Sequence, residues 1–71
     1  MKFVMNDYEP KEIMKIIREW SEMTQEQFGK TINKNRKTIQ HYELGDRNYN
    51  IVTLLEIAKK HNLIITVEKK K

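Results

Sequence analysis

Residues 24–45 read TQEQFGKTINKNRKTIQHYELG, and the fold can be inferred from this segment outward. Thr24 and Gln27 form a capping box, in which the Thr24 hydroxyl accepts from the Gln27 amide and the Gln27 side chain returns to the Thr24 amide. A helix therefore begins directly after Thr24. It ends after about two turns, because Asn33 tolerates a left-handed backbone and Asn35 is a good N-cap for the next helix. The pattern predicts two short helices joined by a tight turn.

The second of these helices, residues 36–44, divides its side chains between two faces. At about 100° per residue, one arc of roughly 140° contains two cations, an amide and an imidazole, while Ile39 and Tyr42 lie opposite. Arg and Lys pair with guanine O6 and N7, and Gln pairs with adenine N6 and N7, so this arc suits a DNA major groove. An ordinary solvated face would have the same composition. The arc consists of Arg36, Lys37, Gln40, His41 and Leu44.

Two glycines mark special backbone positions in the same stretch. Gly29 lies in the middle of the first helix, where glycine costs up to about 1 kcal/mol of helix propensity relative to alanine. This cost is expected at a position where another element packs directly against the helix backbone and leaves no room for a side chain. Gly45 is predicted to end the second helix as a left-handed C-cap.

These motifs resemble the helix-turn-helix of the phage repressor and Cro family, also called the XRE family of bacterial regulators. In that family a hydroxyl residue caps the second helix and precedes Gln, two polar residues, an apolar residue and a small residue, as in residues 24–29. The third helix ends with an apolar or aromatic residue, Glu, any residue and Gly, as in residues 42–45. The family's turn is usually Gly, an apolar residue and Ser, whereas here it is Asn33-Lys34-Asn35. The resemblance covers residues 14–63.

The resemblance implies a fold class: an all-α, λ-repressor-like domain of four main helices, with residues 1–71 forming one domain around the core at 24–45. A first helix is expected over residues 10–22 and a fourth over residues 51–61. Spacings of three and four residues predict which side chains of these helices are buried. The buried positions expected in the first helix are Ile13, Ile16, Ile17 and Trp20, and those in the fourth are Ile51, Leu54, Leu55 and Ala58.

Residues 63–68 differ from the rest of the chain, because they are rich in β-branched side chains and predict a short strand. Leu63, Ile65 and Val67 would share one side of it. A lone strand leaves its backbone unpaired, so it would pair either with residues 1–4 or with the same strand of a second subunit. Cro-like proteins dimerise through a C-terminal strand, so the resemblance implies a homodimer.

Composition excludes several kinds of site. The net charge is +4, and residues 30–47 contain five basic and two acidic residues, which suits a polyanionic partner. There is no cysteine, and two lone histidines, His41 and His61, do not form a zinc site, so neither metal nor cofactor is expected. With 71 residues and two glycines, a catalytic pocket and a small-molecule substrate are not expected either. No signal peptide or membrane-spanning run is found, which favours a cytoplasmic protein.

Three further side chains have specific expectations. Arg18 in the first helix is expected, from the resemblance, to form a structural ion pair with Glu43. His61 is interpreted as a boundary histidine satisfied by hydrogen bonds. Tyr49 either packs in the loop or faces the phosphate backbone.

The sequence therefore predicts a sequence-specific double-stranded DNA-binding transcriptional regulator, repressor or Cro-like, which is not an enzyme. By the family's docking mode, the recognition helix 36–44 enters the major groove, and a dimer would read half-sites about 34 Å apart. Base contacts are predicted for Arg36, Lys37, Gln40 and His41, and phosphate contacts for Thr24, Gln25, Asn35, Thr38 and Arg47.

One alternative belongs to another class. The chain could be a protein-interaction module, such as an antitoxin or accessory regulator, with a weak or vestigial DNA-binding surface. Leu44 on the outward arc and Lys34 in the turn favour this alternative, although Leu44 could also contact a thymine methyl group.

Overall fold

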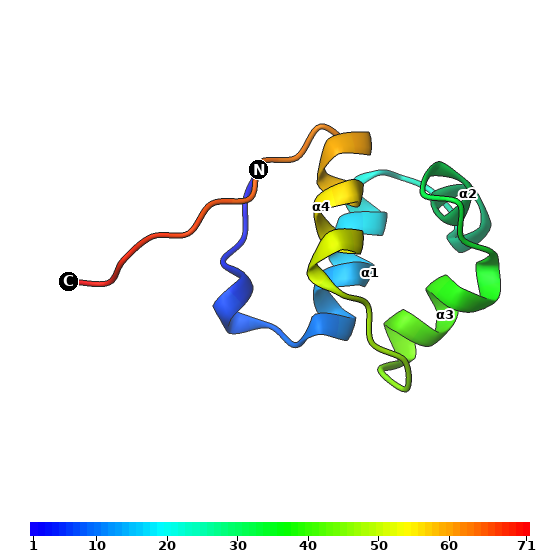
Figure 1. Cartoon of the computed structure of the whole chain (residues 1–71), viewed down its shortest axis with the longest axis horizontal. Coiled ribbons are helices and arrows are strands. Elements are labelled where there is room, and N and C mark those ends of the chain that lie inside the picture. Colours follow the sequence, from blue (N-terminus) through cyan, green and yellow to red (C-terminus); the bar gives the residue numbers. More distant parts are fainter.

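The computed structural model describes all of residues 1–71 and contains four α-helices, one short 3₁₀ helix and no strand (Figure 1). Helices α1 and α4 occupy the middle of the molecule, and α2 and α3 lie together at one end (Figure 1). The all-α class is thus confirmed. The elements are η1 (Met5–Asp7), α1 (Pro10–Trp20), α2 (Gln25–Thr31), α3 (Arg36–Leu44) and α4 (Ile51–Lys60).

Side-chain caps begin three of the four α-helices. The Thr24 hydroxyl accepts from the Gln27 amide at 3.1 Å, and the Gln27 side chain accepts from the Thr24 amide at 3.0 Å. Asn35 caps α3 by accepting from the Thr38 amide at 2.9 Å, and Asn50 caps α4 in the same way. The caps satisfy amides that have no partner within their helix, so the predicted starts of α2, α3 and α4 are confirmed.

Residues with positive φ follow or separate the helices. Asn33 (φ 57°) sits in the turn between α2 and α3, and Asn62 (φ 56°) follows α4. Gly45 (φ 86°) is the left-handed C-cap of α3, and its amide donates to the His41 carbonyl. Of these three positions, Asn33 and Gly45 were expected from the sequence. Glu22 (φ 56°) was not, and α1 ends at Trp20, two residues earlier than predicted.

One apolar cluster joins all four helices. Ile13 and Ile17 of α1 are buried as predicted, while Ile16 and Trp20 are half-buried and Met14 is fully buried. In α2 and α3 the most deeply buried side chains are Phe28 and Ile39, which are both completely covered. The cluster consists of Ile13, Met14, Ile17, Phe28, Ile32, Ile39, Tyr42, Leu54 and Ile57.

The buried side of α4 differs from the prediction. Leu54 is buried, as is Ala58, but Ile51 and Leu55 are 62% and 46% exposed. Ile57 is fully buried instead. Apolar residues extend around most of this helix, so its apolar pattern does not select one side, and the side that packs is rotated by about 80° from the predicted one.

Gly29 is required by the turn between α2 and α3. A Cβ atom added at this position would lie 2.5 Å from the Lys34 carbonyl oxygen and 3.2 Å from the Ile39 side chain. The Lys34 amide donates to the Gly29 carbonyl at 2.8 Å. The turn therefore packs directly on the α2 backbone, and α3 can approach α2 although Lys34 replaces the apolar residue that is usual in the turn.

The predicted C-terminal strand is wrong for the single chain. Residues 64–71 take part in no backbone hydrogen bond, and residues 1–4 do not pair with them. Leu63 and Ile65 instead pack on the core, while Ile64 and Val67 are 89% and 97% exposed. The segment runs away from the helices as an extended tail (Figure 1). A strand needs a partner for its backbone, and this chain alone does not supply one.

Candidate nucleic-acid interface

The outward arc of α3 is accessible, and its opposite side anchors the helix. Arg36 and Lys37 are exposed, whereas Gln40 and His41 are partly exposed. On the other side, Ile39 is completely buried and Tyr42 is 6% exposed. The basic and amide side chains predicted for this arc therefore share one surface. Leu44, at 60% exposure, closes the arc at the end of the helix.

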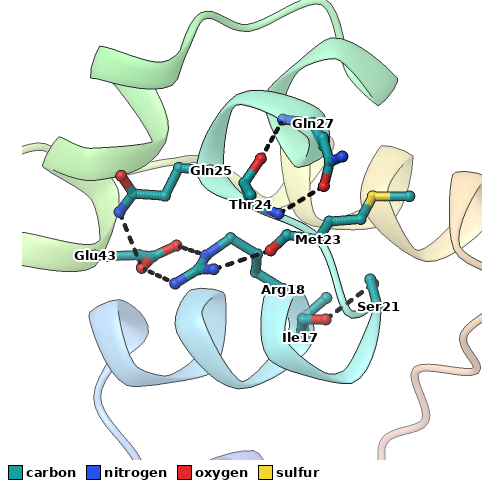
Figure 2. Close-up of polar contacts among 8 residues, drawn as sticks. All are labelled: Ile17, Arg18, Ser21, Met23, Thr24, Gln25, Gln27 and Glu43. Atoms are coloured by element: carbon teal, nitrogen blue, oxygen red, sulfur yellow. Dashed lines mark hydrogen bonds and ion pairs between the residues drawn. The ribbon is translucent and has the colours of Figure 1, made fainter.

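Arg18 and Glu43 hold α3 against α1 (Figure 2). Arg18 Nε donates to Glu43 Oε2 at 2.6 Å, and Nη2 donates to Oε1 at 3.0 Å. The third guanidinium nitrogen donates to the Met23 carbonyl at 3.0 Å, in the loop between α1 and α2. The two side chains are only 17% and 7% exposed. The hydrogen bond from Arg18 to Glu43 raises the pKa of Arg18 above its ordinary value, and burial opposes this effect.

Gln25 extends this ion pair to the start of α2. Its side-chain amide donates to Glu43 Oε1 at 3.3 Å, as Figure 2 shows. The carboxylate thus receives hydrogen bonds from both α1 and α2 while it belongs to α3. A negative charge beside DNA phosphates would repel them, so its neutralisation in the interior favours binding of a polyanion.

The predicted phosphate contacts lie at the helix starts and in the loop after α3. Thr24 and Asn35 are exposed and use one acceptor atom each for capping. The Thr38 hydroxyl donates to Asn35 Oδ1 at 3.0 Å. Gln25 is partly buried by its contact with Glu43, and Arg47 is fully available in the loop. Of the five, Arg47 is the one fixed positive charge.

His41 has a partner that the sequence did not indicate. Its Nδ1 atom lies 2.9 and 3.1 Å from the two carboxylate oxygens of Asp46. The two side chains are 42% and 58% exposed. Residues five apart on a helix are not neighbours, and this contact forms because Gly45 turns the chain back toward α3. The sequence spacing of His41 and Asp46 therefore did not predict this contact.

Tyr49 packs within the loop and fixes its position. The Tyr49 hydroxyl donates to the Pro10 carbonyl at 2.6 Å, and the ring meets Tyr42 edge to face at 5.4 Å. Burial raises the pKa of Tyr49. Of the two expected roles, the structure supports loop packing, which ties the α3–α4 loop to the start of α1.

His61 caps the end of α4 and contacts the ends of two other helices. Its Nδ1 lies 3.3 Å from the Ser21 hydroxyl and its Nε2 lies 2.9 Å from the Thr31 hydroxyl. The ring stacks on Phe28 at 4.8 Å. Burial lowers the pKa of His61, which favours the neutral ring. The predicted role as a hydrogen-bonded boundary histidine is confirmed.

Other kinds of site find little support in the geometry. No group of three or more His, Cys, Asp or Glu side chains could hold a metal ion. None of the helices combines the length and apolar character that crossing a bilayer requires. A shallow depression of about 600 Å³ lies between α1 and the end of α3, and charged side chains such as Lys11 and Glu19 line it together with Ile16 and Leu44.

Comparison with known proteins agrees with this geometry. Two capped helices joined by a tight turn, with an accessible basic arc on the second, define a helix-turn-helix domain. The family model HTH_3, described as helix-turn-helix, matches residues 14–63. The chain therefore belongs to this helix-turn-helix family, the group of the phage repressor and Cro proteins, whose domains bind DNA. No catalytic family is indicated. Neither the curated proteins nor the solved structures contain a match.

Proposed function

We propose that this protein is a sequence-specific double-stranded DNA-binding transcriptional regulator that places α3 in the major groove. The observation that carries the proposal is the division of α3 into two sides. Ile39, Tyr42 and the Glu43 ion pair hold one side in the protein, and the other side presents polar and basic groups that are matched to base edges. Base contacts are assigned to Arg36, Lys37, Gln40 and His41.

Phosphate contacts at both ends of the helix-turn-helix would fix its register on the duplex. Thr24 and Gln25 lie at the start of α2, Asn35 and Thr38 lie at the start of α3, and Arg47 follows α3. Such contacts orient a protein without reading sequence. If about five phosphates are neutralised per subunit, the logarithm of the binding constant falls with the logarithm of salt concentration by about 0.9 per contact.

A homodimer would supply two such surfaces. The C-terminal segment leaves Ile64 and Val67 almost fully exposed and its backbone unpaired, so it is available to pair with the same segment of a second chain. A two-fold dimer would place its recognition helices on half-sites about 34 Å apart.

The proposal is tested by selecting bound duplexes from a random pool and measuring their affinity for variants. Replacing both Arg36 and Lys37 with Ala should abolish specific binding and leave the thermal unfolding midpoint nearly unchanged, because both side chains are exposed. The matched control replaces Lys59 and Lys60, at the far end of α4, and removes the same charge. Equal weakening in the two variants would refute the assignment to α3.

The second candidate is a protein-interaction module such as an antitoxin or accessory regulator. The observation that favours it is the exposure of large apolar side chains, namely Leu44 beside the depression, and Ile51 and Val52 on α4. Light scattering with and without random duplex DNA separates the two. A mass that does not change with duplex, together with a flat salt dependence, would support the protein partner.

A further inference from the structure

The contact between His41 and Asp46 determines which hydrogen-bonding group His41 offers to a ligand. A carboxylate that has lost its proton can only accept hydrogen bonds. Because both Asp46 oxygens lie within 3.1 Å of Nδ1, the hydrogen of a neutral His41 ring belongs on Nδ1. The partner of one ring nitrogen fixes the state of the other, so Nε2 is left without a hydrogen and can only accept.

The remaining nitrogen has no partner within the protein. The side-chain hydrogen bonds of His41 involve Nδ1 alone, and the side chain keeps 42% of its surface exposed on the arc that contains Lys37 and Gln40. Asp46 is the acidic group that faces His41 from outside α3. The nearby cations are Lys37, one turn earlier on the same helix, and Arg47, which follows Asp46 in the loop.

We propose that Asp46 is a positioning residue that presents His41 Nε2 as a hydrogen-bond acceptor, so that His41 selects a base bearing an exocyclic amino group. Adenine N6 and cytosine N4 are the amino donors in the major groove, whereas guanine and thymine present acceptors at the corresponding edges. This inference rests on the proposed function, because it assumes that α3 meets base edges.

The tautomer is measured first, without DNA. Long-range proton–nitrogen correlation spectra of the ¹⁵N-labelled protein at about pH 8 report which ring nitrogen carries the hydrogen. The His61→Gln variant leaves His41 as the one histidine and removes ambiguity in assignment. The expected result is a protonated Nδ1 in His41, and this preference should be lost in Asp46→Asn, whose amide can donate as well as accept. A hydrogen on Nε2 in the parent protein would overturn the inference.

Base preference is measured second, on a duplex selected from a random pool. The duplex is altered at one base pair, the position at which the His41→Ala variant no longer distinguishes between bases. At about pH 8 the parent protein should prefer adenine or cytosine there by about fivefold to tenfold, the effect of one hydrogen bond. Asp46→Asn should lose the preference, and Glu56→Gln, which removes the same charge from α4, should keep it.

The outcomes separate the two proposals. Asp46→Asn also removes a negative charge and should therefore bind all duplexes more tightly, so the ratio of affinities between bases is the quantity compared. A base preference that is unchanged in Asp46→Asn would overturn the role of Asp46 and leave the proposed function intact. Failure to select any duplex would overturn the proposed function and the base preference with it, while the spectra would still decide the tautomer.

Discussion

Arg18 and Glu43 lie 25 positions apart in the sequence and join the first and third helices through two parallel hydrogen bonds, of 2.6 and 3.0 Å. The pair fixes the position of the C-terminal end of the recognition helix. Glu43 also accepts a hydrogen bond from Gln25, at the start of α2. Its role is structural, because both side chains are largely covered. Several measurable consequences follow from this arrangement and from its neighbours.

Replacing Arg18 with Met should destabilise the protein strongly. The variant leaves the Glu43 carboxylate buried without its cation, and breaking a buried pair in this way costs about 3 kcal/mol. The double variant Arg18→Met and Glu43→Leu should regain most of that loss, because it leaves no uncompensated charge. Urea unfolding measures both. A single variant within about 0.5 kcal/mol of the parent, the range of ordinary surface changes, would contradict the structural role.

Replacing Gly29 with Ala should lower stability, although alanine is the better helix former. The gain in helix propensity is up to about 1 kcal/mol, but the added methyl would meet the Lys34 carbonyl oxygen at 2.5 Å, and overpacking of this kind costs about 1 to 3 kcal/mol. Thermal and urea unfolding give the net effect. The control is Glu26→Ala, an alanine substitution at an exposed position of the same helix. A Gly29→Ala protein more stable than the parent would show that the turn does not pack as described.

Stability should fall on acidification because of His61. Burial lowers its folded-state pKa, so the unfolded chain binds more protons than the folded one below about pH 6.5, the ordinary value for histidine. The contribution of this group is therefore fully present above that pH and is lost as the pH falls through the folded-state pKa. Urea unfolding at a series of pH values measures the slope. His61→Gln should flatten it; a slope that this substitution leaves unchanged would contradict this role.

Replacing Ile64 with Lys should convert a dimer to a monomer without loss of monomer stability. Ile64 is 89% exposed in the single chain, so the substitution removes little intramolecular packing. A charge inside a strand pair between two chains would be costly. Sedimentation equilibrium gives the mass relative to the 8.6 kDa chain, with Asn6→Lys as the charge-matched control. If the parent is already a monomer at high concentration, dimerisation through this segment is wrong.

Much of the helix-turn-helix could be predicted because local chemistry specifies it. Thr24 and Asn35 cap helices because their side chains accept from the amide three residues ahead. Asn33 and Gly45 adopt a left-handed φ that these two residue types tolerate. The amphipathic pattern of α3 also gave its buried side, because polar and apolar residues separate clearly around the helix.

The errors arose where the answer depends on distant or absent partners. Ile51 and Leu55 were expected inside and are exposed, because apolar residues surround α4 and packing selects among them. The strand at residues 63–68 requires a partner that the single chain does not provide. Asp46 was missed because its contact with His41 depends on the turn at Gly45. Base and phosphate contacts remain predictions of the site.

A nuclear magnetic resonance titration of the labelled protein with a selected duplex tests directly whether the outward arc of α3 meets base edges. We expect intermolecular Overhauser effects between the side chains of Arg36, Lys37 and Gln40 and base protons of the major groove. Effects confined to Ile51, Val52 and the tail, with the side chains of α3 unperturbed, would rule out this mode of binding.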